Sequence, residues 1–156
     1  MDRMEKLESE YPELKISLDP DMPPHQGGFI YKHEVILNSN KTYQETLGNL
    51  AEEIGHYETS SGDVLHAPYL ENGQQEHRAR AWGYEKLVSL DDLIDCYVSG
   101  DQDIDMVLER LDVTLEYFTK AIDYYRQKYG IVFTHDGYVF DLNSGLNIFP
   151  KLKRKA

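Results

Sequence analysis

Two neighbouring glutamates and a histidine stand close together in the stretch Leu-Ala-Glu-Glu-Ile-Gly-His-Tyr. Glu52 and His56 are four residues apart, a spacing that places both side chains on the same side of an α-helix. A carboxylate and an imidazole at this spacing can hold one divalent cation between them. Glu53 lies beside that pair, where its carboxylate could polarise a water bound to the cation. The pattern indicates a metal site, although the same residues on an acidic helix are also typical of a solvated surface.

A third carboxylate comes twenty residues after the histidine. Glu76 stands at the start of a predicted helix, beside an apolar stripe formed by Ala79, Gly83 and Leu87. A carboxylate in such a place is costly to bury unless it is paired or bound to a metal. A turn and a second helix are enough to bring Glu76 back beside the first helix. Two simpler interpretations stay open, because Glu76 could be favoured by the helix dipole or could pair with Arg80 one turn later.

Capping signals and periodicity predict the helices that must position these residues. Thr42 is a candidate N-cap with Glu45 three residues later, which predicts a helix from about Tyr43 to Glu58. A second helix is predicted from Gln74 to Val88. At 100° per residue, the polar side chains of the first helix lie opposite its apolar stripe. That stripe consists of Leu47, Leu50, Ala51 and Ile54.

Shorter elements are predicted around these two helices. Alternation of apolar and polar residues over 14–18 predicts a strand, and apolar runs at 29–31 and 35–37 predict a hairpin. Helical periodicity continues on both sides of a break at 112–114, as in a helix-turn-helix unit. The remaining predicted elements are a short helix over 2–9, helices over 90–100, 103–111 and 115–129, and a terminal meander with strands at 131–133, 138–140 and 146–149.

The composition predicts one folded domain that does not bind nucleic acid through its average surface. The chain has 156 residues, of which 40% are hydrophobic and 12% aromatic, enough for a real core. Its 28 acidic residues against 16 Lys and Arg leave a net charge of -12, which repels phosphate. The helix-turn-helix-like segment over 103–129 is itself acidic, so we interpret it as a packing module or a protein-docking surface. A DNA-binding regulator using that segment stays a weaker alternative, and it predicts salt-dependent duplex binding.

The sequence has neither the pattern of a secretory signal peptide nor that of a transmembrane helix. The first residues are charged, and no stretch approaches about 18 continuous apolar residues. Cys96 has no second thiol to pair with and is predicted to be a buried apolar residue of a helix. We therefore expect a cytoplasmic protein with no membrane anchor.

The two helical motifs together resemble the ImmA/IrrE family of metallo-endopeptidases, particularly its short prophage-associated members. The first motif is similar to the zincin pattern His-Glu-x-x-His with Glu in place of the first His. The second motif begins at Gln75 and reads Gln-Glu-x-Arg-Ala-x-x-Trp-x-Tyr-Glu-Lys-Leu, and the whole similarity extends over about residues 28–130.

This resemblance implies a zincin-like α+β fold. A small N-terminal β-sheet would pack on the active-site helices, followed by a C-terminal helical pair and a short β-meander. The expected organisation is one metallopeptidase domain over residues 1–156, with the sheet and motif helix in 1–60, the helical part in 74–130 and the meander in 131–150.

The resemblance also implies a role for each candidate residue. Glu52, His56 and Glu76 would bind zinc, and Glu53 would be the general base that moves a proton from the metal-bound water to the leaving amine. Because Glu52 replaces a neutral histidine, the ligand set is harder and more anionic, and Mn²⁺ or Fe²⁺ become plausible occupants. His66 and His77 could supplement the ligands or stabilise an oxyanion, but a surface position is the simpler interpretation.

The expected reaction is hydrolysis of a peptide bond in a protein. By the same resemblance, the substrate would be a helix-turn-helix repressor of a phage or mobile element. The alternative, favoured by Glu52, is a catalytically degenerate zincin that binds the repressor without cleaving it, like an antirepressor. Neither interpretation requires direct contact with nucleic acid or a membrane.

Overall fold

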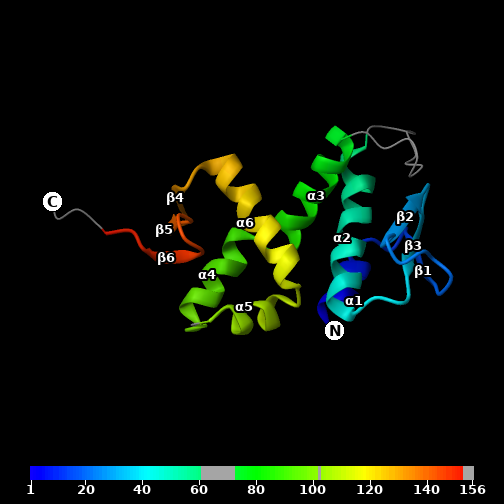
Figure 1. Cartoon of the computed structure of the whole chain (residues 1–156), viewed down its shortest axis with the longest axis horizontal. Coiled ribbons are helices and arrows are strands. Elements are labelled where there is room, and N and C mark those ends of the chain that lie inside the picture. The colour runs from blue at the N-terminus through cyan, green and yellow to red at the C-terminus, as the bar shows by residue number, and fades with distance from the viewer. Residues whose placement is uncertain (61–72, 102, 153–156) are drawn as a thin grey trace.

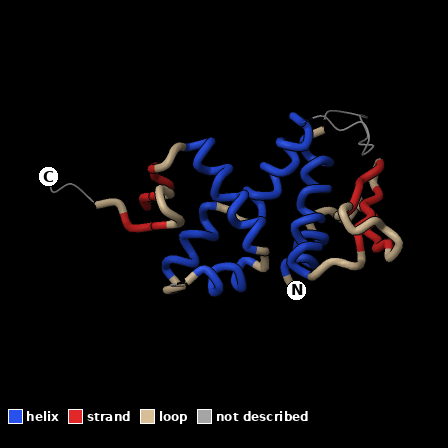
Figure 2. Tube along the Cα trace, in the orientation of Figure 1, coloured by secondary structure: helices blue, strands red, loops and turns tan. Residues whose placement is uncertain are grey.

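The computed structural model describes residues 1–60, 73–101 and 103–152, and it has helices in the middle and strands at both ends (Figures 1 and 2). The helices are α1 (Arg3–Ser9), α2 (Tyr43–Thr59), α3 (Gly73–Leu87), α4 (Leu90–Val98), α5 (Ile104–Leu111) and α6 (Leu115–Tyr129). The strands are β1 (Lys15–Asp19), β2 (Gly28–Tyr31), β3 (Glu34–Asn38), β4 (Val132–His135), β5 (Tyr138–Asp141) and β6 (Asn147–Pro150). The predicted α+β fold class is confirmed, and the elements begin and end close to the predicted residues.

The first sheet has the strand order β1-β3-β2 and lies against α2 (Figure 1). The predicted hairpin is β2 paired antiparallel with β3, and its turn includes Lys32 with a positive φ of 55°. Strand β1 pairs with β3 in parallel, which the local sequence pattern did not predict. The buried side chains of Ile30, Val35 and Leu37 form the face of the sheet that joins the core.

Helix α2 begins at the predicted capping box. The Thr42 side chain accepts a hydrogen bond from the Glu45 backbone N–H, and the Glu45 carboxylate accepts one from the Thr42 backbone N–H. These two bonds satisfy amide groups that have no partner within the helix. The whole predicted apolar stripe of α2 is buried, and it lies in the common core of the molecule.

Helices α2 and α3 pack side by side through small residues (Figure 1). A Cβ atom on Gly55 would lie only 2.3 Å from the backbone oxygen of Ala79, so only glycine fits at this crossing. One turn away, a Cβ on Gly83 would lie 3.5 Å from the Cβ of Ala51. These close approaches determine how the polar residues of the two helices face each other.

The C-terminal half contains the predicted helical pair and meander. Asp112 has a left-handed backbone conformation (φ 55°) and ends α5, and Thr114 caps α6. Strands β4, β5 and β6 form an antiparallel sheet at the opposite end of the molecule from the first sheet (Figure 2). The turn between β4 and β5 has positive φ at Asp136 and Gly137, as a tight hairpin turn requires.

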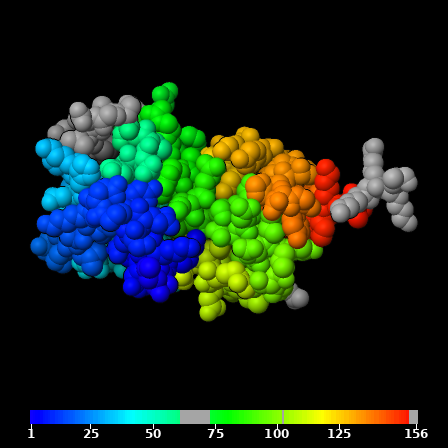
Figure 3. Space-filling model, turned by 180° about the vertical axis from the view of Figure 1, so that it is seen from behind, coloured from blue at the N-terminus to red at the C-terminus, as the bar shows by residue number. Residues whose placement is uncertain are grey.

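The N-terminal helix α1 packs against the ends of other helices. Figure 3 shows this segment, in dark blue, beside the green and yellow helical region of the chain. The guanidinium of Arg3 donates hydrogen bonds to the backbone oxygens of Leu87 and Leu111, which end α3 and α5. None of the helices in the described ranges has the length and apolar character needed to span a membrane.

Candidate metal centre

The predicted site residues line one cleft of about 790 Å³. Its walls come from α2, α3, the first turns of α6 and the loop that leads into β2. Glu52, Glu53, His56 and Glu76 all lie in this cleft, as the helical motifs predicted. The two motifs, which are distant along the chain, therefore form a single site.

Three of these residues have the geometry of a metal-binding group. One ligand atom each from Glu52, His56 and Glu76 lies within 4.8 Å of the other two. The Nε2 atom of His56 is 3.1 Å from the Oε1 atom of Glu76. One nitrogen and two carboxylate oxygens suit zinc and also suit manganese or iron. The donor set therefore fits the metal that the motifs imply.

Glu53 is buried beside the three candidate ligands. The side chain is only 5% exposed. No residue in the described ranges forms a hydrogen bond with the Glu53 carboxyl group. Burial raises the pKa of Glu53 to about 8, and the charges of Glu52 and Glu76 add to this effect. A buried carboxyl group without a hydrogen-bond partner is costly, so its position indicates a role in the cleft.

The candidate ligands influence one another's ionisation. Burial and a hydrogen bond with Glu76 raise the pKa of Glu52, although Arg80 opposes both effects. Burial acts to raise the pKa of Glu76, but the contacts with His56, Glu52 and Arg80 outweigh it and bring this pKa to about 2. Burial acts to lower the pKa of His56, and the surrounding carboxylates outweigh it, so this pKa is raised. The cleft thus concentrates negative charge where a cation would be stabilised.

The helical projection gave the direction of the polar face of α2 but not its surroundings. It placed Glu52, Glu53 and His56 opposite the core, yet Glu53 is only 5% exposed and His56 only 3%. The polar side of α2 faces the cleft, whose walls also include α3, α6 and the loop that leads into β2, so Glu53 and His56 do not lie in open solvent. The interpretation as a solvated surface is therefore excluded for Glu53 and His56.

Arg80 is a site residue whose full role the sequence did not reveal. The ion pair with Glu76 was one of the interpretations that the i,i+4 spacing left open, and the Nη2 atom of Arg80 lies 3.4 Å from the Oε2 atom of Glu76. Its Nε atom also donates a hydrogen bond of 3.1 Å to the Oε1 atom of Glu52 on the other helix. No local spacing predicts a contact between residues that far apart in the chain.

The other histidines differ in their relation to the cleft. His66 lies outside the described residues, and His77 is exposed, with its ring 6.4 Å from the ring of Tyr124. His77 is not among the residues that line the cleft, which fits the simpler interpretation of a surface residue. His25 does line the cleft, although its turn-rich surroundings carried no signal in the sequence.

A tyrosine of α6 covers the two metal-site helices. A Cβ atom on Gly48 would lie 3.1 Å from the Tyr117 ring, and one on Gly83 would lie 2.8 Å from its hydroxyl oxygen. Tyr117 therefore occupies a notch formed by two glycines, one on α2 and one on α3. This contact supports, for Tyr117, the interpretation of the segment over 103–129 as a packing module.

Comparison with known proteins agrees with this geometry. The family model for peptidase M78, described as the IrrE N-terminal-like domain, matches residues 12–123. The matched segment includes the first sheet, both helices of the candidate metal centre and most of α6. No curated protein and no solved structure matches the chain significantly.

Proposed function

Because this chain belongs to the peptidase M78 family of IrrE N-terminal-like domains, we propose that it is a zinc-dependent endopeptidase. The observation that carries the proposal is the convergence of Glu52, His56 and Glu76 within 4.8 Å, with the Glu53 carboxyl group buried beside them. Three ligands on one side leave room for water and substrate on the other side of an ion, as catalytic zinc sites require.

Each residue has a distinct role in this proposal. Glu52, His56 and Glu76 would hold the ion, which would supply a Lewis acid and lower the pKa of a coordinated water. Glu53 would accept a proton from that water and deliver it to the amine of the broken peptide bond. Mn²⁺ or Fe²⁺ could replace zinc, because two of the three ligands are carboxylates.

We propose a protein substrate, specifically a helix-turn-helix repressor of a phage or mobile element. The support for this substrate is the resemblance of the two helical motifs to the ImmA/IrrE peptidases. The cleft, at about 790 Å³, has room for several residues of an extended peptide. Since such repressors act on DNA inside the cell, the reaction would take place in the cytoplasm. The acidic chain would then act on gene regulation through a protein and without binding DNA itself.

The decisive experiment combines metal analysis with a Glu53→Gln variant. The purified chain is expected to contain one equivalent of metal and to cleave its cognate repressor. Glu53→Gln is expected to keep the metal and to lose at least about a hundredfold in rate, because the proton acceptor is gone. Glu58→Gln, an exposed change on the same helix outside the cleft, is the matched control and should cleave normally.

A second function is a degenerate zincin that binds a repressor without cleaving it. The observation that favours it is Glu52 in place of the first motif histidine, which makes the ligand set more anionic and weakens the polarisation of a carbonyl group. This alternative predicts that Glu53→Gln releases repression as well as the unchanged chain does. It also predicts an intact repressor in both cases.

A further inference from the structure

Arg80 contacts both carboxylate ligands of the candidate metal centre. Its Nε atom is 3.1 Å from Oε1 of Glu52, and its Nη2 atom is 3.4 Å from Oε2 of Glu76. The guanidinium group is a planar fork, so two neighbouring N–H groups can orient two acceptors at once. One arginine thus connects a ligand on α2 with a ligand on α3.

The packing of the two helices places Arg80 at this point. On α3, Arg80 lies between Ala79 and Gly83, which lie against Gly55 and Ala51 of α2. On α2, Glu52 lies between the opposite contact points, Ala51 and Gly55. Arg80 and Glu52 are therefore next to the close contacts between the two helices, and their hydrogen bond of 3.1 Å crosses the same interface.

These ion pairs have little value for the stability of the fold. The Arg80 side chain is 56% exposed, and exposed ion pairs stabilise proteins only weakly. Their effect is instead local, because a carboxylate that is held at one oxygen presents its other oxygen in a defined direction. Hydrogen bonds of this kind around metal ligands orient them and strongly affect metal affinity.

We infer that Arg80 is a positioning residue of the metal centre, which holds Glu52 and Glu76 in place and offsets one of their two negative charges. This inference rests on the proposed metal site. The His-His-Glu set of many zinc peptidases carries one negative charge. Two carboxylates and a neutral His56 carry two, and Arg80 brings the sum back to one. Arg80 thereby compensates for the carboxylate that stands where a histidine is usual.

The test is a comparison of zinc binding among variants of the full chain. Zn²⁺ affinity is measured by competition with a chromophoric chelator, and the visible spectrum of the Co²⁺ form reports the coordination geometry. Arg80→Gln is expected to weaken Zn²⁺ binding by about 10–100-fold and to change the Co²⁺ spectrum. Arg80→Lys keeps the positive charge but loses the planar guanidinium group. Its Zn²⁺ affinity should therefore lie between that of the unchanged chain and that of Arg80→Gln.

Two further variants separate positioning from a general charge effect. Arg78→Gln removes the same charge from an exposed position two residues away on α3, and it should bind Zn²⁺ like the unchanged chain. In a Glu52→His background, where one carboxylate is already gone, Arg80→Gln should cost several-fold less affinity than it does alone. Circular dichroism verifies that each variant folds, and Arg80→Lys carries the comparison if Arg80→Gln does not fold.

The outcomes distinguish this inference from the proposed function. Unchanged or tighter Zn²⁺ binding by Arg80→Gln would overturn the inference, and tighter binding would show that Arg80 competes with the metal for the carboxylates. Stoichiometric metal without peptide cleavage would overturn the endopeptidase and leave the role of Arg80 intact. A chain that binds no metal at all would overturn both.

Discussion

Glu53 combines deep burial with two neighbouring carboxylates, and together they bring its pKa to about 8. A divalent cation bound next to it would lower this pKa again, since a positive charge favours the ionised form. A base with a pKa near neutrality both accepts and releases a proton easily at physiological pH. The buried environment of this single side chain is therefore suited to the proton transfer that we propose for it.

Cys96 shows how burial suppresses reactivity at another single position. It is buried on α4, as we predicted for a lone cysteine. Burial is the main cause that raises the pKa of its thiol to about 11, and the negative charge of Asp101 is the next. The thiol therefore stays protonated, and unreactive, until the pH approaches that value. Between the ordinary thiol pKa and 11 the folded chain holds a proton that the unfolded chain has lost, so this residue's contribution to stability falls as the pH rises.

We accordingly expect iodoacetamide to label Cys96 slowly in the native chain at pH 8. The chain unfolded in urea, where the thiol pKa is ordinary and the residue is accessible, should be labelled at once. Mass spectrometry of samples taken over time gives both rates. Equal rates in the native and unfolded chain would show that Cys96 is not protected by the fold.

At the level of elements, the contact between α2 and α3 determines the site. Neither helix carries all three candidate ligands, because Glu52 and His56 lie on α2 and Glu76 lies on α3. The close approach at Gly55 brings the third ligand and Arg80 into range. The site therefore depends on the contact between Gly55 and Ala79, although neither residue has a side chain that could bind a metal or transfer a proton.

Gly55→Ala should separate the two helices. The new Cβ would lie 2.3 Å from the Ala79 backbone oxygen, which cannot move without moving α3. We expect a loss of about 1–3 kcal/mol or more in the free energy of unfolding, measured by urea denaturation, together with weaker Zn²⁺ binding. Gly73→Ala is the control, because a Cβ there has no atom within 4 Å. If both variants unfold at the same urea concentration as the unchanged chain, the contact is not as tight as described.

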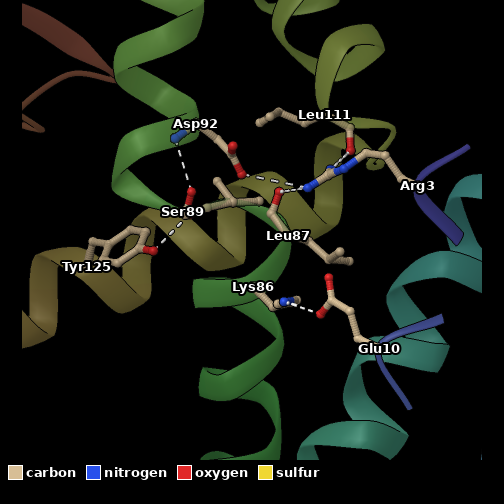
Figure 4. A network of polar contacts seen from close by, with 9 residues as sticks. Arg3, Glu10, Lys86, Leu87, Ser89, Asp92, Leu111 and Tyr125 are labelled. Carbon is tan, nitrogen blue, oxygen red and sulfur yellow. Dashed lines mark hydrogen bonds and ion pairs between the residues drawn. The ribbon is translucent and has the colours of Figure 1, made fainter. Parts of the chain in front are cut away.

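Across the whole molecule, Arg3 joins the N-terminal helix to three other elements (Figure 4). Its guanidinium donates hydrogen bonds to the backbone oxygens of Leu87 and Leu111 and lies 3.7 Å from the Asp92 carboxylate. The terminal carbonyls of α3 and α5 have no partner within their own helices, so Arg3 satisfies both of them. Nearby, Lys86 of α3 pairs with Glu10, which follows α1, at 2.6 Å.

Arg3→Met should therefore destabilise the molecule although Arg3 does not line the cleft. We expect a loss of about 1–3 kcal/mol in the free energy of unfolding, because two carbonyl groups lose a charged donor. Lys15→Met removes an exposed lysine whose ion pair with Glu34 spans 3.9 Å, and it should change stability by less than about 0.5 kcal/mol. Thermal or urea unfolding compares the two, and equal effects would contradict this role for Arg3.

The sequence by itself determined most of the elements and the candidate ligands within one helix. Capping residues such as Thr42 and the periodicity of apolar residues act over a few positions, so they predict where a helix begins and which side is apolar. The i,i+4 relation of Glu52 and His56 follows from helix geometry alone. The position of Glu76 beside an apolar stripe singled it out, family resemblance gave it the role of a third ligand, and the structure brings all three residues together.

Only the tertiary structure decided the contacts between distant segments. The parallel pairing of β1 with β3 and the hydrogen bond from Arg80 to Glu52 join residues with no local relation in the chain. The burial of Glu53 likewise depends on the segments that surround α2, because a projection of α2 alone only places Glu53 on the side opposite the apolar stripe. The physical reason is that residue spacing determines in which direction each side chain of a single helix points. The distance and rotation between two helices depend instead on which residues meet at their interface, here Gly55 against Ala79.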